Sequence, residues 1–135
     1  MAKSSGLGWT TLNVDNAAAT PNDLRNDCTD LQFATPRAVQ DYTGIDKSAM
    51  ERMLLLADFS IDMKGIFNPA ANKSHDTFKT IPSTSVQRTV ALGVNGVSLS
   101  NECVLTDYQI QRSNSGELTW SVPGVLADGT VPTWS

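Results

Sequence analysis

Few residues of this chain have the types and spacing that catalysis needs. The single histidine, His75, stands beside Asp76, and this pair lacks the adjacent nucleophile of a hydrolytic triad. The sequence contains no Gly-x-Ser-x-Gly turn, no phosphate-binding glycine-rich loop and no His/Cys cluster with metal-ligand spacing. It therefore predicts no metal site and no cofactor, and His75 is expected on the exposed surface of a helix.

Paired carboxylates are the other route to catalysis, because two acids suffice for glycoside hydrolysis. Four aspartates could meet if their strands are neighbours, namely Asp30, Asp58, Asp62 and Asp107. Each stands at an outward-facing strand position or at the boundary of an element, where a solvated surface residue is the ordinary outcome. We therefore expect that the protein is not an enzyme.

Length and charge narrow the remaining classes of protein. A chain of 135 residues is long enough for one domain with a sizeable core. Its net charge of −4 argues against tight binding of nucleic acid, because such binding needs basic residues to neutralise phosphates. Residues 1–10 contain no apolar run and no stretch approaches about 20 apolar residues, so we expect no signal peptide and no membrane insertion.

Cys28 and Cys103 lack zinc or redox spacing and are expected as free core residues.

The central stretch of the chain predicts helix, strand and helix in that order. Ser48 and Glu51 have the spacing of a capping box, which predicts a short helix over 48–57. Apolar and polar residues then alternate over 59–67, as in a half-buried strand. Asn68-Pro69 is typical of a helix start, so a second helix is expected to end at Ile81.

The flanking segments predict further strands around this centre. Residues 27–33 alternate, and 34–47 are expected as a long mobile loop between strands. Asn95-Gly96 predicts a tight hairpin between strands 86–94 and 97–112. The apolar phase of the second strand slips, which predicts either a bulge near Thr106-Asp107 or burial on both faces.

The two ends of the chain complete the domain organisation. Alternation over 118–122 predicts a strand that Pro123-Gly124 ends. Residues 6–22 show no sustained period, so 1–22 is interpreted as an N-terminal arm and 23–135 as a single domain. Trp9 is the one anchor of this arm, which is either frayed or ordered against a neighbouring subunit.

Three short stretches resemble the major tail proteins, or tail tube proteins, of long-tailed bacteriophages. They are DYTGIDKSA at 41–49, Glu51-Arg52 with Leu54-Leu55, and GIFNP at 65–69. The order of elements over residues 24–125 fits as well. The resemblance implies a mainly β fold with a flanking helix (α+β), a β-sandwich or rolled antiparallel sheet of the phage tail-tube type. It also implies a structural virion protein whose hexameric rings stack into the tail tube through which the genome is ejected.

Partners and location are also implied by this resemblance. The chain would bind further copies of itself, the tape-measure protein, and the tail terminator and distal tail or baseplate proteins. DNA would pass through the lumen without specific binding. The location would be the virion tail, assembled in the host cytoplasm. Many relatives carry an additional immunoglobulin-like domain, which is not expected in this chain.

Alternation assigns residues to the surfaces of such a ring. The expected lumen-facing residues are Asp30, Gln32, Ser60, Asp62 and Lys64, with Leu31, Phe33, Phe59, Ile61 and Met63 turned to the core. The expected inter-subunit or ring-stacking residues are Trp9, Arg37, Val39, Tyr42, Ile45, Lys47 and Trp134. Exposed aromatic residues are typical interface anchors.

Two other readings fit the same sequence. One is a different tail or baseplate component of the same fold, because fold alone does not fix copy number. The other is a monomeric β-sandwich that binds a carbohydrate or a receptor. Such a module needs clustered aromatic residues on a concave patch, whereas Trp9, Trp120 and Trp134 are scattered along the sequence.

Overall fold

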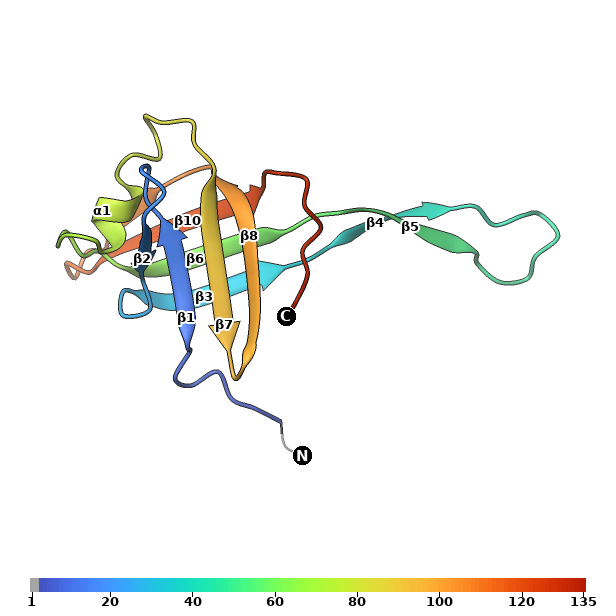
Figure 1. The fold of residues 1–135 in the computed structure, drawn as a ribbon, viewed down its shortest axis with the longest axis horizontal. Helices are drawn as coiled ribbons and strands as arrows, with labels where there is room; N and C mark the ends of the chain where they lie inside the picture. Colours follow the sequence, from blue (N-terminus) through green and yellow to red (C-terminus); the bar gives the residue numbers. More distant parts are fainter. Residues whose placement is uncertain (1–2) are drawn as a thin grey trace.

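A computed structural model describes residues 3–135 and shows a β-rich fold with one short helix (Figure 1). The strands are β1 (Thr11–Asp15), β2 (Pro21–Asp23), β3 (Cys28–Ala34), β4 (Arg37–Asp41), β5 (Arg52–Ala57), β6 (Ser60–Ile66), β7 (Arg88–Val94), β8 (Val97–Leu105), β9 (Gln109–Arg112) and β10 (Leu118–Leu126). The helix is α1 (Ser74–Phe78). No helix within residues 3–135 is long and apolar enough to cross a membrane.

Eight strands form one antiparallel sheet in the order β2-β1-β7-β8-β10-β6-β3, and β9 also pairs with β10. Strand β10 links two layers, because β6 lies along one of its edges while β9 and then β8 share the other. The sheet rolls over itself, so that β1, β7 and β8 cross β10, β6 and β3 (Figure 1). The core lies between these layers.

Alternating side chains fill the core from both layers, as the sequence predicts. Phe59, Ile61 and Met63 are buried on one layer, and Trp120 and Val122 join them from β10. Residues of the other layer complete the core, namely Leu12, Val14, Val90, Leu92, Leu99 and Cys103. The expected inward residues of β6 and β10 are therefore confirmed.

The predicted turn at Asn95-Gly96 is confirmed. Both residues have positive φ, 51° and 85°, and they connect β7 to β8. The expected single strand over 97–112 is corrected, because β8 ends at Leu105 and the chain resumes as β9 at Gln109, so the chain leaves the strand where a bulge near Thr106-Asp107 was predicted. Strand β10 continues past Pro123, which corrects the expected end there. The Pro123 carbonyl accepts from Thr106 N–H at the junction between β9 and β8, where the missing proline N–H breaks no regular ladder.

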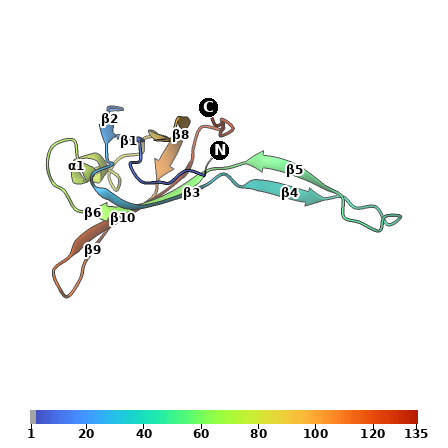
Figure 2. The same cartoon turned by 90° about the horizontal axis from the view of Figure 1, so that it is seen from below.

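The expected helix over 48–57 and the expected loop over 34–47 are both wrong. Strand β4 pairs antiparallel with β5, and together they form a separate two-stranded hairpin. Asp58 N–H donates to the Pro36 carbonyl at 2.9 Å and closes the base of the hairpin. The hairpin extends away from the rolled sheet in both views (Figures 1 and 2). Pairing between distant residues has overridden the helical spacing of the apolar side chains.

The segment 6–22, expected as an arm, instead contains β1 and the first two residues of β2, and both strands belong to the main sheet. The expected second helix is shorter than its pattern suggested. Asn72 has a positive φ of 62°, and regular helix begins only at Ser74. The Ser74 N–H donates to the buried carboxylate of Asp27 at 3.0 Å, so the cap comes from a distant part of the chain.

Candidate assembly surfaces

The first surface is the outer face of the half-sheet β9-β10-β6-β3. Register places Asp30 and Ser121 on either side of Lys64, and Gln109 beyond Ser121. In antiparallel strands, directly opposed residues point to the same face. This row forms the middle of an open hollow of about 730 Å³. The row therefore brings side chains from four strands onto one surface.

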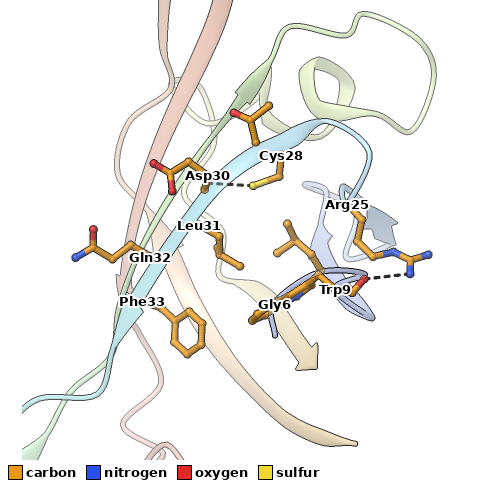
Figure 3. Close-up of a pocket in the computed structure, with 10 residues that line it drawn as sticks. Gly6, Trp9, Arg25, Cys28, Asp30, Leu31, Gln32 and Phe33 are labelled. Atoms are coloured by element: carbon orange, nitrogen blue, oxygen red, sulfur yellow. Dashed lines mark hydrogen bonds between the residues drawn. The ribbon is translucent and has the colours of Figure 1, made fainter. Parts of the chain in front are cut away.

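All five residues expected to line a lumen lie on β3 and β6, which are neighbouring strands of this half-sheet. Asp30, Gln32, Asp62 and Lys64 are exposed, and Ser60 is half-buried. Figure 3 shows the side chains of Asp30 and Gln32 on one side of β3 and those of Leu31 and Phe33 on the other. The alternation inferred from the sequence is thus correct, while a role in a lumen stays a prediction.

Sequence reasoning missed the contribution of β9 and β10 to this polar face. Gln111 lies opposite Thr119, and Gln109 lies opposite Ser121. The outward phase of Thr119 and Ser121 was visible as alternation in the sequence. Nothing in the sequence linked Gln109 and Gln111 to Lys64, because that proximity depends on β9 pairing with β10. Most side chains on this face are neutral and can form hydrogen bonds, and Asp30, Asp62 and Lys64 are its charged residues.

The second surface consists of two free sheet edges that bound this half-sheet. Among residues 3–135, β3 pairs only with β6, and β9 pairs only with β10. Each leaves a row of backbone N–H and C=O groups available to another strand. Free edges are a hazard for aggregation unless they are covered or paired. The two edges stand at opposite sides of the same polar face, so a further strand can extend the sheet at either edge.

The third surface is the hairpin of β4 and β5 with its tip. Every residue of β4 is exposed, and the apolar side chains of the hairpin are largely solvent-accessible. They are Val39, Tyr42, Ile45, Met50, Met53, Leu54, Leu55 and Leu56. Five of the seven expected stacking residues lie here, namely Arg37, Val39, Tyr42, Ile45 and Lys47. The sequence analysis missed Met53 to Leu56 as exposed residues, because it placed them in a helix.

Polar contacts hold the hairpin in shape. The Arg37 guanidinium donates to the Leu55 carbonyl at 2.7 and 3.0 Å, across a register shift between the two strands. At the tip, the N–H and hydroxyl of Thr43 donate to the Asp41 carboxylate, and these bonds lower the pKa of Asp41. Lys47 pairs with Asp46 at 3.6 Å on an exposed surface. Arg37 and Lys47 therefore have partners within the hairpin itself.

Trp9 and Trp134, the other two expected stacking residues, meet at one seam of the body. Their rings lie 6.5 and 6.0 Å from the ring of Phe33. The backbone of Ser135 exchanges two hydrogen bonds with Ser98, which anchors the C-terminal end. Trp134 remains 48% exposed. The tryptophans that are scattered in sequence are thus partly gathered in space.

An open cavity of about 510 Å³ lies beside this seam (Figure 3). Leu31 and Phe33 point toward it from β3, and Trp9 borders it from the N-terminal segment. Cys28 also lines it, and burial raises the pKa of its thiol. The cavity is mainly apolar and has no array of convergent polar groups typical of a ligand site.

The residues considered as candidates for catalysis do not lie together in one site. His75 is half-buried, which corrects its expected exposure, and its Nδ1 lies 3.1 Å from the Tyr108 hydroxyl. Asp30 and Asp62 share the polar face, whereas Asp58 lies at the hairpin base and Asp107 between β8 and β9. No group of three or more His, Cys, Asp or Glu residues within 3–135 could hold a metal ion.

Comparison with known proteins identifies the fold. No protein-family model and no curated protein sequence matches the chain. A chain in the tail of an empty gene transfer agent particle, determined with C6 symmetry, is 14% identical with a TM-score of 0.73, covering 98% of this chain and 99% of that chain. A chain in the virion of a native gene transfer agent particle is also 14% identical, with a TM-score of 0.69 and 99% coverage of both chains. The fold is that of a phage-like tail-tube protein, and the fold class expected from the sequence is confirmed.

Proposed function

We propose that this protein is a structural, non-enzymatic virion protein whose copies form hexameric rings that stack into a tail tube. The observation that carries the proposal is the likeness of the whole chain to a chain of a C6-symmetric tail. Three features of the chain support it independently: a polar outer face, free strand edges on both sides of that face, and a projecting apolar hairpin.

Ring closure uses the two edges of the half-sheet. The free edge of β3 in one copy pairs with the free edge of β9 in the next. When the copies close into a ring about a rotation axis, every such edge is paired. Each copy then contributes β9, β10, β6 and β3 to a continuous sheet. The ring interface is formed mainly by backbone hydrogen bonds, so few side chains are needed to specify it.

The polar face lines the lumen of the tube in this arrangement. Asp30, Asp62 and Lys64 give it a charge of −1 per copy, from two carboxylates and one ammonium group. Like charge keeps phosphates from adhering, and with a Debye length of about 10 Å at 0.1 M salt the repulsion acts only near the wall. Double-stranded DNA would therefore slide through without specific binding during ejection into the host.

Stacking of rings uses the hairpin, with Tyr42 and Ile45 at its outer end. The other proposed partners follow from the same role: the tape-measure protein in the lumen, and the terminator and distal tail or baseplate proteins at the two ends. Assembly would take place in the host cytoplasm, and the product would be part of the virion.

Size-exclusion chromatography and negative-stain electron microscopy of the purified protein, at low and high concentration, test the proposal. We expect rings or uniform hollow tubes that grow with concentration. A monomer at every concentration would overturn self-assembly of this chain.

A charge variant tests which face lines the lumen. Asp30→Lys with Asp62→Lys changes the polar face from −1 to +3 per copy, and we expect its tubes to retain double-stranded DNA that wild-type tubes release. Asp107→Lys with Asp128→Lys makes the same charge change at two exposed residues that do not line the polar hollow, and it is the matched control. DNA retention by the control alone would refute the assignment of the lumen.

A further inference from the structure

The tight turn between β7 and β8 contains a pair of residues that can react with each other. The pair is Asn95 and Gly96, and Asn95 is the one asparagine of the chain that a glycine follows. Both residues are exposed and have positive φ, 51° and 85°. Such a turn needs positive φ at both positions, which asparagine and glycine adopt readily.

The backbone nitrogen of this pair is open to the solvent. A Cβ added at Gly96 would meet no atom within 4 Å, so the space beside this residue is empty. Among residues 3–135, no backbone carbonyl accepts a hydrogen bond from the Gly96 N–H. Because glycine has no side chain, its amide nitrogen can approach the preceding side chain without a clash. The Gly96 nitrogen is therefore unhindered as a nucleophile.

The reaction between the two residues needs only water. The Gly96 amide nitrogen loses its proton to the solvent and forms a bond to Cγ of Asn95, and the bond from Cγ to Nδ2 breaks. Nδ2 takes up a proton and leaves as ammonia, so a cyclic imide remains. Water then opens the imide at either carbonyl. Breaking the new bond from nitrogen to Cγ gives aspartate, whereas breaking the original main-chain bond gives isoaspartate, in which the chain runs through Cβ and Cγ.

The same side-chain amide holds the N-terminal segment against the body. The Asn95 Nδ2–H donates to the Ser5 carbonyl at 3.0 Å. The next hydrogen bonds from this segment to β7 come from the N–H and hydroxyl of Thr10, which donate to the Gly93 carbonyl. Trp9 precedes them and borders the open cavity of about 510 Å³ (Figure 3). A carboxylate at position 95 has no hydrogen to donate, so its contact with Ser5 is lost.

We propose that Asn95-Gly96 is a site of spontaneous deamidation, at which Asn95 becomes aspartate or isoaspartate and thereby frees residues 3–8 from the body. The inference does not depend on the proposed assembly, because an isolated monomer contains every group that takes part. Each conversion also adds a negative charge to the turn, because a neutral amide becomes a carboxylate. The rate rises with pH, because the attacking nitrogen must first lose its proton.

Two other asparagines of the chain serve as internal controls. Asn72 is exposed and has a positive φ of 62°, like Asn95, but Lys73 follows it. Asn114 is exposed in another turn, and Ser115 follows it. The purified protein is incubated at mildly alkaline pH, and peptide mass spectrometry follows the replacement of each amide by a carboxyl group. We expect Asn95 to convert more than about tenfold faster than either control, because a side chain on the next residue hinders the attack.

A protein-isoaspartate methyltransferase detects the rearranged main chain, because it transfers a methyl group to the isoaspartyl carboxylate. We expect the aged wild-type protein to accept methyl groups at position 95. Asn95→Gly retains residues suited to the turn and should accept none there. Equal rates at Asn95, Asn72 and Asn114 would overturn the inference. Conversion of Asn95 in urea but not in the folded protein would also overturn it, because the turn would then protect the amide.

Hydrogen exchange tests the release of the N-terminal segment. Asn95→Asp supplies the carboxylate without lengthening the main chain. We expect residues 3–8 to exchange about fivefold faster in this variant and in the aged wild-type protein than in fresh protein, because one hydrogen bond is lost. A peptide from β10 is the control and should exchange at the same rate in all three samples. Unchanged exchange of residues 3–8 after complete conversion would overturn the release.

Discussion

Removing the carboxylate of Asp27 should cost a large share of the stability of the fold. Asp27 is 3% exposed and joins two parts of the chain that are far apart in sequence. One oxygen accepts from the Asn68 side-chain amide and the other from the backbone N–H of Ser74, both at 3.0 Å. This carboxylate therefore holds the start of α1 against the turn that leads into β3.

The magnitude follows from these two contacts. Hydrogen bonds to charged groups contribute about 1.5 to 3 kcal/mol each, and removal of the acceptor leaves two donors unpaired in a buried region. We expect Asp27→Ala to lower the free energy of unfolding by about 3 to 5 kcal/mol. Asp27→Asn retains one neutral acceptor and should lose about half as much.

Urea denaturation of the monomer, followed by the fluorescence of buried Trp120, measures this loss. With a slope of about 2 kcal/mol per molar urea, Asp27→Ala should lower the midpoint by about 2 M. Asp62→Ala removes an exposed carboxylate and serves as the control. A decrease below about 1 kcal/mol for Asp27→Ala, similar to that of the control, would refute the reasoning.

Three further predictions concern the packing of the body. Gly65→Ala should give insoluble protein on expression, because an added Cβ would lie 2.0 Å from the Asp27 carbonyl oxygen. Arg88→Met should lower the free energy of unfolding by about 2 kcal/mol in the same denaturation assay, because the buried guanidinium satisfies backbone carbonyls that would lose their donor; equal stability would contradict this. Burial raises the pKa of Cys103 to about 12 and also raises that of Cys28, so both thiols stay protonated at pH 8. An aromatic disulfide reagent at pH 8 should label them slowly in the folded protein and rapidly in urea, and equal rates would refute this.

Alternation made much of the body predictable from sequence. Phe59, Ile61 and Met63 are buried as their period indicates, and Asp62 and Lys64 face outward. Such a strand is a local pattern, since each side chain alternates whatever its partner strand is. For the same reason, the polar face could be foreseen on β3 and β6, although not its extension by Gln109 and Gln111.

The hairpin was not predictable in this way. The run Met53-Leu54-Leu55 is apolar at consecutive positions, so it lacks the alternation of a half-buried strand, and its flanking residues fit helical spacing. Strands β1 and β2 were missed for a related reason. Thr11–Asp15 depends on pairing with β7, which lies far along the chain. The local sequence does not indicate which strand is its partner.

The base of the hairpin has a consequence for the evolution of the protein. The Asp58 N–H closes on the Pro36 carbonyl, so residues 37–57 leave the body and return to it at one point. Longer or shorter insertions at such a closed base add little loop-closure entropy and leave the rolled sheet intact. Natural selection can therefore change the length and side chains of the hairpin while the strands of the body stay constant. We therefore expect related chains to differ in this segment before they differ in the strands of the body.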